Sequence, residues 1–150
     1  MAWCCMKKYD NYVSNLDVLK HADEQELDNE FVIGGIKDKF CLQFELGWKL
    51  LKELLAYEGR AEAATGSPRE IIKAAYAVYD FMDETVWLDM LRDRNTSTHI
   101  YDGEEVRRLA QRVIDRYIPA FERMRHAIDA RYADIIALCT LSAAHSLAKS

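Results

Sequence analysis

The sequence contains little glycine, little proline and no long apolar run. With 6 glycines and 2 prolines in 150 residues, a β-sandwich is disfavoured, because its many turns need both residue types. No segment reaches the roughly 18 apolar residues of a membrane span, and the apolar tail is interrupted by Asp134 and His145. The apolar start precedes Lys7 and Lys8, unlike a secretion signal. We therefore expect a cytoplasmic protein with no membrane partner.

Cysteine is present, but its spacing forms no recognisable site. Cys4, Cys5, Cys41 and Cys139 show neither a C-x-x-C pair nor a histidine at ligand spacing, so neither a metal site nor another cofactor is expected. The net charge of −5 excludes a surface that attracts nucleic acid everywhere. Any RNA binding would need a local basic patch.

Helical periodicity dominates the rest of the chain, and its length suits one domain spanning 1–150. Apolar residues recur every three or four positions, and in the third stretch they are Ile71, Ile72, Ala75, Tyr76 and Val78. Ser67, Asp83 and Asp102 are expected as N-caps, with Asp102 and Glu105 forming a capping box, and Gly59 is expected as a C-terminal cap. Gly34 and Gly35 mark either the start of the second helix or a kink in it. We expect a broken or restarted helix at Pro119, and helices at about 7–21, 36–58, 67–78, 83–96, 102–128 and, as an extra C-terminal element, 132–150. The pattern predicts an all-α antiparallel bundle of four to five helices.

The segment Arg94–Tyr101 (RNTSTHIY) gathers an arginine, an amide, three hydroxyls, an imidazole and a phenol. Asn95 to Thr98 are poor helix formers, so the fourth helix should end or distort there. Without a break, Arg94 and His99 would lie about 140° apart around a helix. A break lets both reach one ligand, and two subunits could alternatively pool these residues across a twofold axis.

Arginine and histidine together suit phosphate chemistry. The guanidinium fork can clamp a phosphate and stabilise added charge on phosphorus, and an imidazole can move a proton to or from a ribose or leaving oxygen. A plainer interpretation stays open, in which Arg94 pairs with Asp93 or Asp89 while His99 and Tyr101 pack a turn between helices.

Three blocks of the chain resemble the nucleotidyltransferase substrate-binding protein family, a branch of the HEPN superfamily. The blocks are Phe40–Lys52 (FCLQFELGWKLLK), Ser67–Tyr76 (SPREIIKAAY) and Trp87–Asp102, and together they span a family-like core of about 36–117. The chain departs from the family at Tyr79, where glycine is more frequent, and after Tyr132, where it is longer. These departures leave the geometry of the nearby loop and of the dimer edge open.

The resemblance implies an antiparallel helical bundle, usually a homodimer, that acts with a separate minimal nucleotidyltransferase. In related toxin–antitoxin pairs the HEPN member is an RNase toxin, and its motif maps onto Arg94 and His99 as catalytic residues, with Asn95 as the polar residue after the arginine. The extended motif ends in a tyrosine, here Tyr101, which accepts AMP from the partner and thereby silences the toxin.

Several other residues have competing interpretations. Glu45 could orient Arg94 or His99, or it could be an ordinary solvated glutamate that pairs with Lys49. Trp48 and Trp87 are expected as core anchors. The row Arg108, Arg112 and Arg116 could follow an RNA backbone toward His99, or be a surface paired with carboxylates such as Asp115 and Glu105.

Three functions remain open at this point. The chain could be the RNase half of a pair with the nucleotidyltransferase, with structured RNA such as tRNA as substrate. It could be a non-catalytic subunit that binds a nucleotide or another substrate for that enzyme, or a plain helical interaction protein. It is not itself a nucleotidyltransferase, because it lacks the Gly-Ser loop and paired aspartates that hold magnesium and triphosphate.

Overall fold

A computed structural model describes residues 2–148, except for the side chains of 2–6, 62, 64, 139–140, 142–143 and 145–146. About 85% of the chain is helical, and the described residues contain no strand. This confirms the all-α prediction. The helices are α1 (Ala2–Leu19), α2 (Glu30–Tyr57), α3 (Pro68–Val78), α4 (Glu84–Thr96), α5 (Gly103–Arg112), α6 (Ile118–Arg131) and α7 (Ala133–Ala148).

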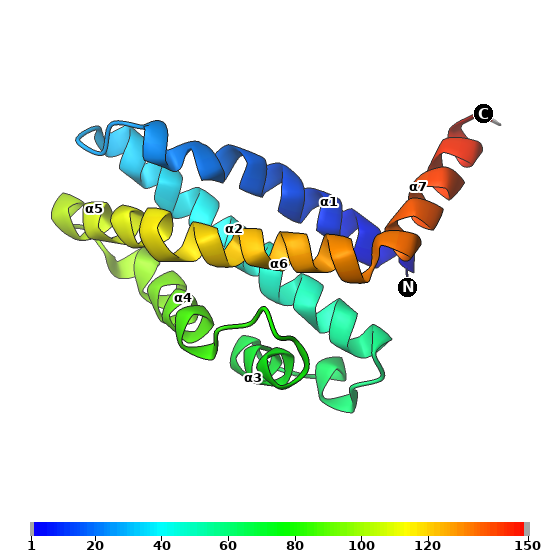
Figure 1. The fold of residues 1–150 in the computed structure, drawn as a ribbon. Helices are drawn as coiled ribbons and strands as arrows, with labels where there is room; N and C mark the ends of the chain where they lie inside the picture. Colours follow the sequence, from blue (N-terminus) through cyan, green and yellow to red (C-terminus); the bar gives the residue numbers. More distant parts are fainter. Residues whose placement is uncertain (1, 149–150) are drawn as a thin grey trace.

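The helices form an antiparallel bundle around one core (Figure 1). Helix α1 runs against α2, while α4 runs against α5 and α6, which follow one another almost in line. Between α5 and α6 the backbone makes a π-helical turn, Val113–Tyr117, and Pro119 occupies the first turn of α6. The expected break near Pro119 is therefore confirmed. Helix α7 points away from the bundle.

Capping side chains explain where the helices begin. Ser67 accepts a hydrogen bond from Glu70 N at 3.3 Å while the Glu70 carboxylate accepts from Ser67 N at 3.1 Å, which is a complete capping box. Asp83 accepts from Val86 N at 3.3 Å at the start of α4. Gly59 follows the end of α2 with a φ of +80°, a conformation that favours glycine. These three sequence predictions are confirmed.

Other expectations need correction. Helix α1 begins at Ala2, before Lys7, and α2 begins at Glu30 after an Asn29 cap, so that Gly34 and Gly35 lie inside the helix. Asp102 caps α5, but it accepts from Glu104 N at 3.0 Å, one position earlier than the capping box requires. Tyr76, expected on the apolar side of α3, is 53% exposed.

Aromatic side chains fill the core between α1, α2, α4 and α6. The ring of Phe40 stacks on Tyr117 with centroids 5.2 Å apart, and Trp87 meets Phe121 edge-to-face at 5.6 Å. Trp87 is fully buried, as expected, whereas Trp48 is only half-buried against the core. The expected role of Trp48 as a core anchor is therefore met only in part.

A network of polar side chains crosses this core and joins α1 to α2 and α6. Asn15 Nδ2 donates to Gln43 Oε1 at 2.8 Å and to Lys39 O at 3.0 Å, while Gln43 Nε2 donates to Tyr12 O at 3.1 Å. The Tyr12 hydroxyl in turn donates to Phe121 O at 2.7 Å. Because buried amides are costly when unpaired, these contacts fix the register of α1 against α2.

Among the described helices, α7 has the most apolar composition, so we considered whether it could span a membrane. Leu138, Leu141 and Leu147 are each at least 66% exposed on it. Within the described residues, no helix combines the length and apolar character that crossing a bilayer demands.

Candidate functional site

The fourth helix ends because its own hydroxyl side chains bond back to its carbonyls. Thr96 Oγ1 donates to Arg92 O at 3.0 Å, and Ser97 Oγ donates to Arg94 O at 2.7 Å. Such bonds compete with helix continuation, and the chain passes into a 3₁₀ turn, Ser97–His99. The backbone then becomes extended at Ile100, with φ −90° and ψ 111°. The predicted break between Arg94 and His99 is thus present.

Arg94 reaches back to α2. Its guanidinium forms an ion pair with Glu45, donates to Asn95 Oδ1 at 2.9 Å, and lies 5.9 Å from the ring centroid of Phe44. Glu45 also lies 3.5 Å from Lys49 Nζ. Glu45 therefore contacts Arg94, as one of the two sequence interpretations proposed. Asp93 and Asp89, the carboxylates expected to pair with Arg94 in the plainer interpretation, have other partners.

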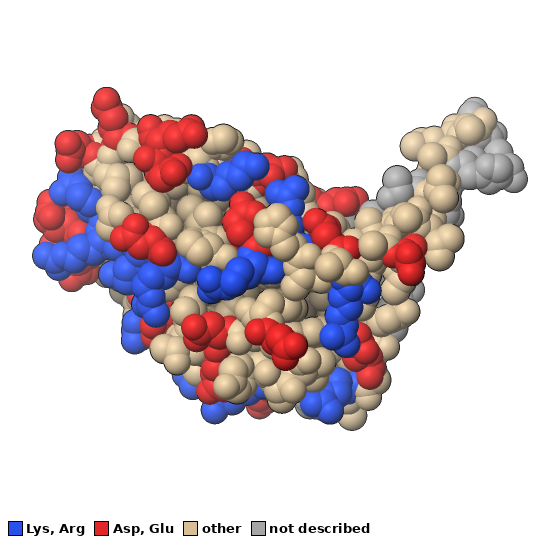
Figure 2. Space-filling model, viewed as in Figure 1, with Lys and Arg blue, Asp and Glu red and all other residues tan. Residues whose placement is uncertain are grey.

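His99 faces the opposite way, toward α5. The side chain is exposed and lines a surface hollow with a volume of about 370 Å³, bordered by Thr96, His99, Ile100, Glu105, Arg108 and Arg112. Two guanidinium groups and one carboxylate line the hollow together with the imidazole, and the carboxylate of Asp93 engages one of these guanidinium groups, that of Arg112. Figure 2 shows lysine and arginine side chains gathered over α5 and its border with α4.

Tyr101 lies two residues beyond His99 in the extended connection that leads to α5. Its side chain is 89% exposed, and the phenol engages no other side chain in the described part of the protein. A hydroxyl in this position is open to a second protein, and the cap at Asp102 fixes the backbone directly after it.

The structure brings some predicted site residues together and separates others. Arg94, Asn95 and Glu45 form one cluster against α2. His99 belongs to the hollow at α5, and among the described residues that line this hollow Arg94 and Tyr101 do not occur. Within one copy of the chain, Arg94 therefore does not line the hollow that His99 borders.

The arginine row on α5 and the π-helical turn divides into different environments. Arg112 donates to both carboxylate oxygens of Asp93, at 2.9 and 3.0 Å, and Arg116 donates to Asp89 at 3.0 Å. No hydrogen bond or ion pair engages Arg108 within the described residues. Arg112 and Arg116 are therefore paired with carboxylates, as one interpretation of the sequence predicted, but the partners are Asp93 and Asp89 and not Asp115 and Glu105.

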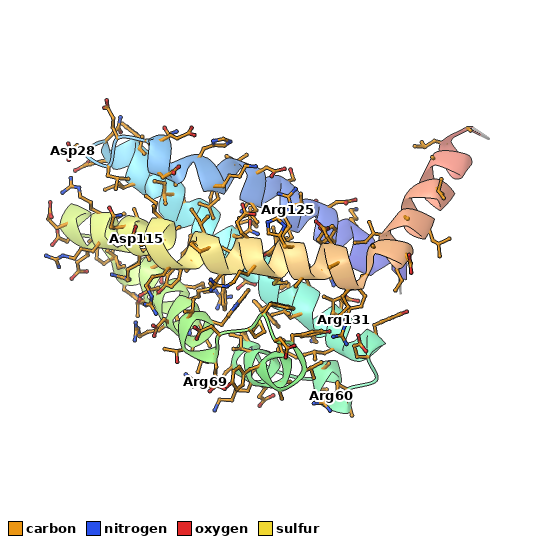
Figure 3. The ribbon with its side chains drawn as sticks, in the orientation of Figure 1. Asp28, Arg60, Arg69, Asp115, Arg125 and Arg131 are labelled. Atoms are coloured by element: carbon orange, nitrogen blue, oxygen red, sulfur yellow. The ribbon has the colours of Figure 1, made fainter. Side chains whose placement is uncertain are left out.

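The two carboxylates expected to pair with this row lie elsewhere. Asp115 accepts from Gln111 at 3.0 Å on the outer side of the bundle (Figure 3), and Glu105 borders the hollow. Sequence reasoning missed the role of Asp93. A usable signal was present, because Asp89 and Asp93 repeat at four residues on α4, just as Arg112 and Arg116 do on the facing segment.

Asp93 is 6% exposed and holds a buried polar network. Besides its two bonds from Arg112, it accepts a hydrogen bond from the Tyr117 hydroxyl. Burial, followed by this hydrogen bond, raises the pKa of Tyr117 well above its ordinary value, so the phenol remains a donor. The hydrogen bonds to Asp93 also raise the pKa of Arg112. Arg112 is thus held rigidly at the edge of the His99 hollow.

In a comparison with protein families, residues 6–130 match a family described as nucleotidyltransferase substrate binding protein like. This range covers most of the chain. The chain belongs to the nucleotidyltransferase substrate-binding protein family. No curated protein matches it.

The family match extends beyond the three blocks that carried the resemblance. It includes most of α1 and nearly all of α6, and it contains every residue of the Arg94 cluster and of the His99 hollow. It ends before α7, which begins at Ala133. The C-terminal helix is therefore an addition to the matched part of this nucleotidyltransferase substrate-binding protein. Among the described residues, no group of three or more His, Cys, Asp or Glu side chains is placed to hold a metal ion.

Proposed function

We propose that this protein works with a separate minimal nucleotidyltransferase and, when unmodified, cleaves RNA without a metal as the RNase toxin of a toxin–antitoxin-like pair in the cytoplasm. The observation that carries the proposal is the broken end of α4, which leaves His99 in a hollow lined by two arginines and Tyr101 exposed two residues beyond it. Family membership supports the association with a nucleotidyltransferase.

In the proposed cleavage, His99 accepts the proton of a ribose 2′-hydroxyl. The freed oxygen attacks the adjacent phosphorus and the bond to the 5′-oxygen breaks, leaving a 2′,3′-cyclic phosphate. The leaving oxygen takes a proton from water or from a second imidazole. Arg94, oriented by Glu45 and Asn95, stabilises the charge on phosphorus. A homodimer would bring Arg94 of one copy to His99 of the other, since Arg94 does not line the His99 hollow of its own copy.

The nucleotidyltransferase would silence this activity at Tyr101. The phenol oxygen attacks the α-phosphorus of ATP, pyrophosphate leaves, and the phenolic proton passes to a base of the partner enzyme. The product is a phosphodiester of AMP on a side chain that is 89% exposed. Its negative charge and bulk next to His99 would compete with an RNA phosphate.

A cleavage assay in the presence of EDTA tests the nuclease proposal. Purified protein should cut structured RNA such as tRNA, and His99→Ala should slow cleavage by about 10²–10⁴-fold because proton transfer is lost. Arg94→Ala should slow it by about 10²–10³-fold. His126→Ala is the matched control, because this histidine is also exposed but lies on α6. Equal cleavage by the His99→Ala variant and the control would contradict the proposal.

One observation favours a second candidate, a non-catalytic subunit that binds a nucleotide for the nucleotidyltransferase. Arg94 is already engaged by Glu45 and Asn95, and Trp48, on the same helix as Glu45, has a buried Nε1 without a hydrogen-bond partner in the described structure. In this candidate, ATP quenches the fluorescence of Trp48 without being turned over, and Trp48→Phe removes the quenching. Quenching without RNA cleavage would favour this function over the nuclease.

A further inference from the structure

Two arginines border the hollow beside His99, and among the described residues only one of them, Arg112, is fixed by a carboxylate. Arg112 is held at its Nε and Nη2 by the buried Asp93, at 2.9 and 3.0 Å. This bidentate contact occupies one edge of the planar guanidinium, so its other edge, with Nη1, remains for an anion. Arg108, one helical turn earlier, is exposed and engages no described side chain.

Asp93 makes Arg112 a preorganised group rather than a mobile one. The carboxylate is 6% exposed, and the buried Tyr117 hydroxyl also donates to it. An arginine fixed in this way loses little side-chain entropy when it binds an anion. Arg116 differs, because its carboxylate partner, Asp89, also contacts Arg92 at 3.3 Å and lies outside the hollow.

We propose that this hollow is a binding site for one phosphate of a single-stranded RNA backbone, with Arg112 as the fixed clamp and Arg108 as the second cation. The identity of the anion rests on the proposed RNase function, whereas the site itself rests on the geometry of Asp93, Arg112 and His99. Arg94 has a separate role, because its guanidinium points to α2 and not into the hollow.

The surrounding charges favour a single phosphate over a long anionic surface. Glu105 also borders the hollow and Asp93 already engages Arg112, so little cationic charge is left for an anion and a second phosphate would be repelled. The protein as a whole carries a net charge of −5, which opposes non-specific binding of nucleic acid. Binding at this site should therefore be local and should depend on both arginines.

The test uses a fluorescent 2′-O-methyl oligoribonucleotide, which the proposed nuclease cannot cut because its 2′-oxygen is blocked. Arg108→Ala should weaken binding about three- to tenfold, and the slope of log Kd against log salt should fall by about 0.7, the value for one lost contact to a single strand. Arg112→Lys should weaken binding by a similar factor with little change in slope, because it keeps the charge but loses the fork.

Arg123→Ala is the matched control, since this arginine is exposed on α6 and removes the same charge outside the hollow. It should bind like the unmodified protein, and circular dichroism should show that all variants keep their helices. If Arg108→Ala and Arg112→Lys bind like the control, or if the unmodified protein does not bind the probe at all, the inference is wrong.

The binding test and the cleavage test can fail separately. Loss of binding in the Arg108 and Arg112 variants, with no cleavage of ordinary RNA by the unmodified protein, would keep the phosphate site and remove the nuclease proposal. Cleavage that is unaffected in both variants would keep the nuclease proposal and remove this site.

Discussion

Asp93 illustrates how a single side chain links the core to the candidate site. It faces α5 and the π-helical turn from α4, accepts two bonds from Arg112, and takes a third from Tyr117. Its neighbour Asp89, one turn earlier, accepts a single hydrogen bond of similar length from Arg116. The two aspartates therefore compare a buried, bidentate ion pair with a more exposed pair that has one hydrogen bond.

We predict that Asp93→Ala lowers the free energy of unfolding by about 2 kcal/mol, because it leaves Arg112 and the Tyr117 hydroxyl without their acceptor. Asp89→Ala should cost less than about 1 kcal/mol, as expected for a surface pair. Urea denaturation of the two variants measures the difference. Equal losses would contradict the structural role assigned to Asp93.

At the level of the single helix, α2 packs tightly against its neighbours at Gly47. A Cβ atom there would lie 3.2 Å from Trp87 Cη2 and 3.4 Å from Tyr12 Cε2. Both rings are fully buried, so neither has room to move. Gly35 lies on the same helix, but a Cβ atom there would meet nothing within 4 Å. Close packing therefore requires glycine at position 47, whereas position 35 has room for a larger side chain.

We predict that Gly47→Ala lowers the free energy of unfolding by about 1 kcal/mol, since the cost of overpacking exceeds the gain in helix propensity. Gly35→Ala should instead raise it by about 0.5–1 kcal/mol. Thermal or urea unfolding of both variants is the measurement. A stabilising Gly47→Ala would show that α2 and Trp87 are not packed as described.

The junction of α2 with α6 provides a prediction about pH. Glu58 accepts from the Tyr132 hydroxyl at 2.7 Å and from Arg131 at 3.1 Å (Figure 3). The Tyr132 hydrogen bond, followed by that of Arg131, lowers the pKa of Glu58 below its ordinary value of 4.5. Since the folded pKa is depressed, Glu58 contributes stability above about pH 4.5, and this is lost as pH falls through the folded pKa.

Glu58→Gln should therefore be less stable than the unmodified protein at pH 7, and the difference should shrink as the pH is lowered below 4.5. Glutamine keeps an oxygen that can accept from Tyr132, so the comparison isolates the charge. Urea denaturation at several pH values measures it. A stability difference that stays constant down to pH 3 would contradict the pairing of Glu58 with Tyr132 and Arg131.

At the scale of the whole molecule, local signals were readable from the sequence and long-range contacts were not. Ser67, Asp83 and the run after Arg94 act on their own backbone within four residues, so their effects followed from residue type. The pairing of Arg94 with Glu45 was one of the open interpretations of the sequence, but the pairing of Arg112 with Asp93 was not expected, because it depends on how two segments pack. Periodicity shows which side of a helix is apolar, but not which residue lies opposite.

The same limit applies to the arginine row. Its spacing was visible, but only the packing of α4 against α5 and the π-helical turn shows that Arg112 is clamped by Asp93 while Arg108 remains available. The motif from Arg94 to Tyr101 was found from sequence, yet its division into one cluster at α2 and one hollow at α5 was not. This division depends on the packing of the end of α4 against both α2 and α5, which residue type alone does not show.

The most direct test of the role of Tyr101 and its neighbours is the intact mass of the protein after co-expression with the proposed partner, a separate minimal nucleotidyltransferase. The unmodified sequence should gain the mass of one AMP unit or a multiple of it, and the modified protein should no longer cleave RNA. Tyr101→Phe should gain nothing, whereas Tyr76→Phe, a control at another exposed tyrosine, should be modified normally. An unchanged mass, or equal modification of Tyr101→Phe, would contradict the proposed switch.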